Sequence, residues 1–278
     1  MITTPIELEG GEILESMESV KDCGHSKGHF LGQQCLSCAS ELLCDKDMLP
    51  LSRKRILSKL QRQFHEEFSM HTGHQKTQML AVLLPGLICS IRSATGQHGQ
   101  ILDMLVENFP AVALINRAIP QLMFEIEPET VGADVILRLL TNVQSRNDPE
   151  QALLCRDDQI SQYTLASLWT GRPATTETSL YLIWLMLQDR YEPFKEQLCA
   201  NFNENLSPLL DLLSSKTPFQ LQLNLFGVLN QIGAVKPSSE SREQMCSSFA
   251  VLLRQKPFLR KTMVCMVQVS TLFEMLRP

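Results

Sequence analysis

The stretch that most constrains the fold is residues 207–233, SPLLDLLSSKTPFQLQLNLFGVLNQIG. It contains two helix starts of one kind, Ser207-Pro208 and Thr217-Pro218, in which a hydroxyl can accept the free N–H groups of the first turn and proline follows where no intrahelical N–H is needed. The first predicted helix is short, and Gly233 can close the second. Apolar side chains cover more than one side of the second helix: Phe219, Leu221, Leu223, Leu225, Phe226, Val228, Leu229 and Ile232. Such a pair needs neighbours on two sides, as in stacked helical repeats.

Most of the chain upstream and downstream also shows helical periodicity. One set of apolar residues three or four apart predicts a helix that begins near Ser52: Ile56, Leu57, Leu60, Phe64 and Phe68. Residues 75–92 predict another helix, kinked at Pro85 because proline removes a backbone hydrogen bond. Further helices are predicted at 101–108, in three pieces within 111–142 separated at Pro120 and Pro128, and at 160–168, 178–188, 193–201, 242–254 and 257–275. Alternating β-branched runs are missing, so we expect almost no sheet.

The spacing of these helices predicts the architecture. Helix starts recur roughly every 40 residues where the spacing is regular, which is typical of armadillo or HEAT repeats. The sequence therefore predicts an all-α fold, specifically an irregular armadillo- or HEAT-like helical-repeat solenoid. Residues 1–33, rich in glycine, serine and alternating charge, are predicted to be a poorly ordered tail. Residues 34–278 are predicted to form the repeat domain, with a polar linker at 235–241.

Composition narrows the compartment and the class of partner. No apolar run approaches the roughly 18 residues of a membrane span, and the acidic start carries no secretory signal. Nine cysteines without such a signal favour a reducing compartment. A net charge of −5 argues against attraction of the whole surface to DNA. Binding of DNA through a local basic patch is still compatible with this charge. We expect a soluble intracellular protein.

A cluster of cysteines and histidines near the start has two interpretations. Cys35 and Cys38 form a CxxC pair, and with Cys23, His25 and His29 they are candidate ligands for tetrahedral zinc. Alternatively, Cys35 and Cys38 lie on one apolar side of a helix among neighbouring leucines. Because the sequence has no second CxxC pair at finger spacing, we favour the helix and predict neither a metal site nor a cofactor.

A basic cluster is a second candidate site. Arg53, Lys54, Arg55, Lys59 and Arg62 lie within ten positions and could contact phosphates or act as an import signal. The alternative is the solvated side of an amphipathic helix. We favour this alternative, since no aromatic residues are interleaved for base stacking.

Catalytic motifs are missing from the sequence. It contains no GxSxG, HExxH, P-loop or GxGxxG pattern, and we predict no catalytic residue and no enzyme activity. The acidic pairs at 66–67 and 157–158 are interpreted as exposed charges. Trp169 and Trp184 are expected to fill space between helices, although Trp169 is also a candidate surface anchor for a partner.

Three segments, in order along the chain, are similar to segments of a known family. CLSCASELL at 35–43 resembles an early CLxCAxELL segment, and SRKRILS at 52–58, continuing to His71-Thr72, resembles the basic helix that follows it. NLSPLL at 205–210 and QLQLNLFGVL at 220–229 resemble a helix pair with NLxPL-like and ELQIN-CLGLL-like sequences. The family is that of meiosis inhibitor protein 1, animal relatives of a plant factor that initiates meiotic recombination.

The resemblance implies a role for the chain. It implies a non-enzymatic α-helical repeat scaffold in the nucleus, associated with chromosomes, that is needed for programmed double-strand breaks and homologue synapsis in meiosis I. Its expected partners are other break-formation proteins. The resemblance also places Cys35 and Cys38 on a helix and supplies no upstream metal ligands.

Family members are several times longer than this chain, which suggests a short isoform or a fragment. A last helix without a polar cap would expose apolar residues, so self-association or a bound partner is expected there; these residues are Val264, Met266, Val267, Leu272 and Met275. Two other functions stay open. One is a general helical-repeat adaptor outside meiosis, and the other is a weak nucleic-acid-binding module that uses the Arg53–Arg62 helix.

Overall fold

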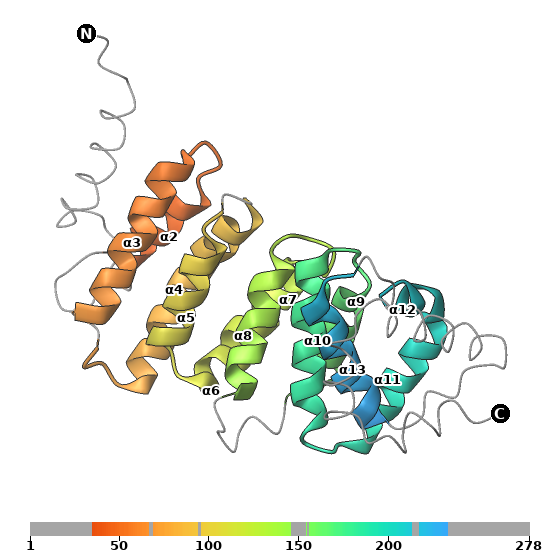
Figure 1. The fold of residues 1–278 in the computed structure, drawn as a ribbon. Helices are drawn as coiled ribbons and strands as arrows, with labels where there is room; N and C mark the ends of the chain where they lie inside the picture. The colour runs from red at the N-terminus through yellow and green to blue at the C-terminus, as the bar shows by residue number, and fades with distance from the viewer. Residues whose placement is uncertain are drawn as a thin grey trace, which may run out of the picture. The chain divides into compact units, whose positions relative to one another are not determined.

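The regular structure is helical in all parts of the chain that are described. The computed structural model describes residues 35–66, 69–93, 96–145, 154, 156–212 and 217–232, and these contain no strand (Figure 1). The predicted all-α class is confirmed. Contacts divide the chain into two compact units, Met1–Leu139 and Leu140–Pro278.

The helices of the first unit are α2 (Leu36–Cys44), α3 (Pro50–Glu66), α4 (Gly73–Arg92), α5 (His98–Asn108), α6 (Ala111–Ala113), the π-helical turn η2 (Leu114–Ala118), α7 (Ile119–Glu125) and the start of α8 (Ala133–Ser145). Those of the second unit are the end of α8, α9 (Asp158–Leu168), α10 (Pro173–Leu187), α11 (Glu192–Glu204), α12 (Leu206–Leu212) and α13 (Phe219–Ile232). None of these helices is long and apolar enough to cross a membrane.

In the first unit, helices two apart in the chain pack together. α2 packs along α4, and α3 packs along α5 (Figure 1). The apolar stripe predicted for α3 faces this core: Ile56, Leu57, Leu60 and Phe64 are fully buried. Phe64 also meets Phe109 edge-on, with ring centroids 5.1 Å apart.

The contact between α2 and α4 depends on a glycine and a serine. A β-carbon placed on Gly86 would lie 2.6 Å from the carbonyl oxygen of Ser40, closer than real β-carbons approach backbone atoms. The Ser40 hydroxyl accepts the N–H of Gly86 at 2.9 Å and lies 3.4 Å from the carbonyl oxygen of Leu83. Pro85 has no N–H to donate, yet α4 continues on both sides of it. The Ser40 hydroxyl thus forms hydrogen bonds with backbone groups of α4 on both sides of this proline.

Local signals explain where several helices begin. Thr72 and Gln75 form a reciprocal capping box that starts α4 two residues earlier than the predicted Gln75. The carboxylate of Asp157 accepts the N–H groups of Gln159 and Ile160 and so caps α9. Asp157 is exposed, as expected from the sequence, and it is also a helix cap.

The predicted break at Pro120 is wrong. α6, η2 and α7 run on without interruption through residues 111–125. In the wide turn η2, the N–H of Ile119 bonds to the carbonyl of Leu114, five residues back. A new α-helical turn starts at Ile119, so Pro120 occupies a first-turn position that needs no N–H. The predicted break at Pro128 is confirmed, since Pro128 lies between α7 and α8.

In the second unit, α10 is the central helix. It packs on both α9 and α13, and α9 also contacts α11 (Figure 1). α10 contributes buried apolar residues on several sides: Leu180, Leu182, Ile183, Met186 and Leu187. A matching set on α13 is also buried: Leu221, Leu225, Val228 and Leu229. The helical interpretation of residues 219–232 is confirmed.

The two helix starts proposed at Ser207 and Thr217 differ in outcome. α12 begins at Leu206, so Ser207 lies inside that helix. α13 begins at Phe219, directly after Thr217-Pro218, as predicted. The Thr217 hydroxyl also donates a hydrogen bond to the carbonyl of Asp211 at 3.2 Å. The predicted tail 1–33, the linker 235–241 and the helices at 242–254 and 257–275 lie outside the described residues, as does the apolar end proposed for self-association.

Candidate functional sites

Of the basic cluster on α3, Arg53 faces inward. It is only 3% exposed, and its Nη2 donates a 2.7 Å hydrogen bond to the carbonyl oxygen of Asp45. Asp45 is the residue that ends α2. A guanidinium at the carboxyl end of a helix is favoured by the partial negative charge there. Arg53 thus joins α3 to the end of α2 and is not part of an exposed basic surface.

The other cations of α3 lie on its outer side. Lys54, Arg55 and Arg62 are exposed, and Lys59 is half-buried. Ser58, between them, accepts a 2.7 Å hydrogen bond from the amide of Gln100 on α5. The exposed side of α3 therefore carries a short basic stripe, which is smaller than the sequence cluster by one arginine.

The zinc candidates are brought together only in part. Cys35 is 1% exposed, and its Sγ accepts the N–H of Cys38 at 3.4 Å, so it acts as the N-cap of α2. Cys23, His25 and His29 lie outside the described residues. Within the described ranges, no group of three or more His, Cys, Asp or Glu side chains is placed to hold a metal.

A different cysteine pair is close in space. The Sγ atoms of Cys44, at the end of α2, and Cys89, on α4, are 2.8 Å apart. Partial burial, reinforced by the hydrogen bond and the charge of Cys89, raises the pKa of Cys44 to about 12. Cys44 therefore keeps its proton at neutral pH and is a poor nucleophile. Because the two cysteines are 45 positions apart, no local motif marks them.

Trp169, the proposed partner anchor, is engaged within its own unit. The Trp169 side chain is half-buried, and its Nε1 donates a 2.8 Å hydrogen bond to Oδ1 of Asn201 on α11. Its ring meets that of Phe202 edge-on, with centroids 5.8 Å apart. These contacts are those of a residue that fills space between helices, which the sequence also suggested.

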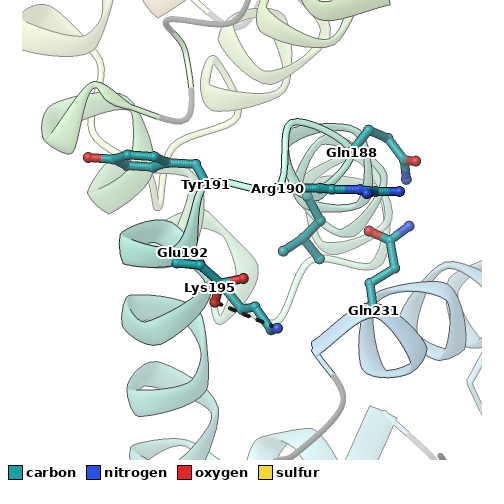
Figure 2. Close-up of a pocket in the computed structure, with 7 residues that line it drawn as sticks. Gln188, Arg190, Tyr191, Glu192, Lys195 and Gln231 are labelled. Carbon is teal, nitrogen blue, oxygen red and sulfur yellow. Dashed lines mark ion pairs between the residues drawn. The ribbon is translucent and has the colours of Figure 1, made fainter.

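The second unit contains a cavity that the sequence did not indicate. It lies at the end of α10, the start of α11 and the end of α13, and its volume is about 440 Å³ (Figure 2). The lining consists of Leu187, Gln188, Arg190, Tyr191, Glu192, Lys195 and Gln231. In Figure 2 the polar ends of the Gln188, Arg190 and Gln231 side chains lie on one side of the cavity. The phenol of Tyr191 points in the opposite direction, away from them.

Positive charge and an uncapped helix start characterise this cavity. Lys195 forms a 3.7 Å ion pair with Glu192, a carboxylate whose side chain is 68% exposed. Arg190 is exposed and has the only positive φ among non-glycine residues of the described ranges, at 52°. Tyr191, the N-cap of α11, offers no side-chain hydrogen bond to the first turn. The helix start thus adds partial positive charge.

The sequence signal for this cavity is faint. Four lining residues lie in the segment QDRYE (188–192), where α10 ends and α11 begins, but this string matches no binding motif. Lys195 follows on α11, and the last polar group, Gln231, comes from a helix end about 40 positions further on. Only the fold brings these groups together.

Comparisons with protein-family models, with curated proteins and with solved structures found no match to this chain.

Proposed function

We propose that this chain is a helical-repeat scaffold that binds protein partners and performs no chemistry of its own. We further propose, from the family resemblance, that it acts in the meiotic nucleus in programmed double-strand break formation and homologue synapsis. The observation that carries the scaffold proposal is the order in which the helices pack.

In the first unit, and in part of the second, helices pack as corresponding members of successive pairs. In the first unit, α2 lies on α4 and α3 lies on α5, so the pair α2–α3 is followed by the pair α4–α5. In the second unit, α9 lies on α11 while α10 lies on α13. In armadillo and HEAT proteins each helix packs on the corresponding helix of the next repeat. This stacking buries a continuous core and leaves elongated surfaces for partners. This order favours an irregular solenoid within each unit.

The meiotic part of the proposal rests on segments that lie on packed helices. The segment 35–43 provides Cys35 and nearly all of α2, 52–58 lies in α3, and 220–229 lies in α13. Their buried residues include Leu36, Leu57 and Leu225. The similarity thus concerns core positions, whose spacing is preserved when a fold is kept.

The proposal is tested by locating the protein and its partners. A tagged chain should associate with chromosomes in meiotic prophase and should capture break-formation proteins from germ-cell extract. Its loss should reduce recombinase foci and synapsis. Equal capture of a different partner set from somatic extract, with normal synapsis after loss, would contradict the meiotic role and favour the general adaptor.

The exposed stripe on α3 favours nucleic-acid binding as a second candidate function. Lys54, Arg55 and Arg62 together could neutralise up to three phosphates, and each neutralised phosphate contributes about −0.9 to the slope of log affinity against log salt. If this function holds, duplex DNA should bind with a slope down to about −3. Reversing all three charges should abolish this binding.

The variant used in this experiment leaves Arg53 unchanged. Because Arg53 is buried against Asp45, its substitution would disturb the fold and confuse the result. The triple variant should therefore be Lys54→Glu, Arg55→Glu and Arg62→Glu, with far-UV circular dichroism recorded in parallel. A flat salt dependence for the unmodified chain would rule out DNA binding through this stripe.

A further inference from the structure

We propose that the cavity at the ends of α10 and α13 binds an acidic segment of a protein partner, whose carboxylates are held by Arg190 and Lys195. This inference rests on the proposed scaffold function and names the chemistry of one partner. Five features of the cavity support it: its size, its charge, the backbone conformation of Arg190, its apolar wall and the state of its aromatic ring.

The size fits peptide side chains. A volume of about 440 Å³ falls in the range of roughly 300–1,000 Å³ that is usual for ligand pockets. It is much larger than a single inorganic anion requires. Two or three adjoining side chains of an extended segment would fill it.

The charge favours a carboxylate. The backbone N–H of Arg190 donates to the carbonyl of Leu187, but its side chain lines the cavity without a hydrogen-bond or ion-pair partner among the described residues. Its planar guanidinium can hold a carboxylate through two parallel hydrogen bonds. Lys195 is only weakly neutralised, because its partner Glu192 is largely solvated at 3.7 Å. The side-chain amides of Gln188 and Gln231 add N–H donors to the lining. The lining therefore contains more hydrogen-bond donors than its single carboxylate, that of Glu192, can accept from. Donors remain for an anion that a partner supplies.

The backbone at Arg190 is consistent with a functional side chain there. A φ of 52° is the left-handed region, which glycine or asparagine occupies at lower cost than arginine. This turn nevertheless carries a long cationic side chain that lines the cavity. Such an outlier motivates a functional hypothesis for the Arg190 side chain.

The remaining lining favours a peptide over a nucleic acid. Leu187 supplies an apolar wall that suits the methylene groups of glutamate or an adjoining apolar residue. The only aromatic ring of the lining, Tyr191, is covered by the guanidinium of Arg156 at 5.6 Å and points away from the opening. Base stacking, which dominates single-strand binding, therefore has no free ring in this lining.

The test uses the full chain and defined probes. Fluorescence anisotropy would be measured with an end-blocked hexaglutamate peptide, and hexaglutamine would serve as the uncharged probe. Variants Arg190→Gly and Lys195→Gln each remove one cation, and the glycine also suits the left-handed backbone, so the fold is kept. Lys46→Gln, which removes an exposed cation outside both the lining and the basic stripe of α3, is the matched control.

We expect hexaglutamate to bind saturably and hexaglutamine not to bind. Each cavity variant should weaken binding about tenfold, as loss of a charge-assisted hydrogen bond does, while the control variant should bind as the unmodified chain. Unchanged binding in both cavity variants, or no saturable binding at all, would overturn the proposal. Competition by inorganic phosphate or by oligothymidine at concentrations below those of hexaglutamate would overturn it in favour of a phosphate or nucleic-acid site.

A second measurement separates this proposal from the scaffold function. If the unmodified chain captures partners from extract and Arg190→Gly captures the same set, the cavity proposal fails while the scaffold function stands. If the unmodified chain captures nothing, the scaffold function itself fails. Loss of one acidic partner from the Arg190→Gly sample supports the cavity proposal if hexaglutamate releases the same partner from the unmodified chain.

Discussion

Replacing Gly86 with alanine should lower the free energy of unfolding of the first unit by roughly 2–4 kcal/mol. The added methyl would lie 2.6 Å from the carbonyl oxygen and 2.7 Å from the Cα of Ser40, which are backbone atoms of α2. Because backbone cannot turn aside as a side chain can, α2 and α4 must separate. Separation also strains the buried 2.9 Å hydrogen bond from Gly86 to the Ser40 hydroxyl.

The measurement is the urea midpoint followed by far-UV circular dichroism. Gly99→Ala on α5 is the matched control, since nothing lies within 4 Å of the position of its added methyl. That variant should be neutral or up to about 1 kcal/mol more stable, because alanine is the better helix former. If both variants shift the midpoint equally, the close approach of α2 and α4 is wrong.

Replacing Trp169 with alanine should destabilise the second unit by about 3 kcal/mol. The substitution removes the ring that packs edge-on against the fully buried Phe202. It also removes the donor to Asn201. Trp169→Phe should cost less, because an aromatic ring is retained and only the 2.8 Å hydrogen bond and part of the ring volume are lost.

Two measurements distinguish a packing role of Trp169 from a partner-anchoring role. The thermal unfolding midpoint should fall for Trp169→Ala, whereas Phe124→Ala should change stability by less than about 0.5 kcal/mol because Phe124 is 87% exposed. An unchanged midpoint for Trp169→Ala, together with lost capture of partners, would instead identify Trp169 as a surface anchor.

The sequence predicted the helices where local periodicity determines them. In α3 the spacing of Ile56, Leu57, Leu60 and Phe64 selected the buried side without knowledge of its neighbour. Proline and threonine before α13 likewise marked its start at Phe219.

Hydroxyl residues misled the prediction where they lie inside a helix. Thr178 was expected to start a helix, but α10 begins at Pro173. The Thr178 hydroxyl donates to the carbonyl of Ala174 one turn earlier, and Thr176 donates to the carbonyl of Leu168. Because a threonine hydroxyl can bond to backbone in a cap or within a helix, its presence alone does not locate a helix end.

The candidate sites could be predicted only where neighbours in sequence remain neighbours in space. Arg53 and Lys54 are adjacent, yet one is buried and the other exposed, because successive residues on a helix point about 100° apart. Cys44 meets Cys89, and Gln231 joins Arg190 at the cavity, through contacts between distant segments. Such contacts arise from packing, which no local pattern encodes.

The position of α10 between α9 and α13 limits how this protein can be dissected. A shorter version that stopped at residue 212 would keep α9, α10, α11 and α12 and yet remove α13. Trp184 would then lose the close-fitting Gly227 backbone, which lies against its indole ring. The apolar side of α10 that packs against α13 would then be exposed to water, which favours aggregation. Truncations should therefore be placed upstream of α9 or beyond residue 232.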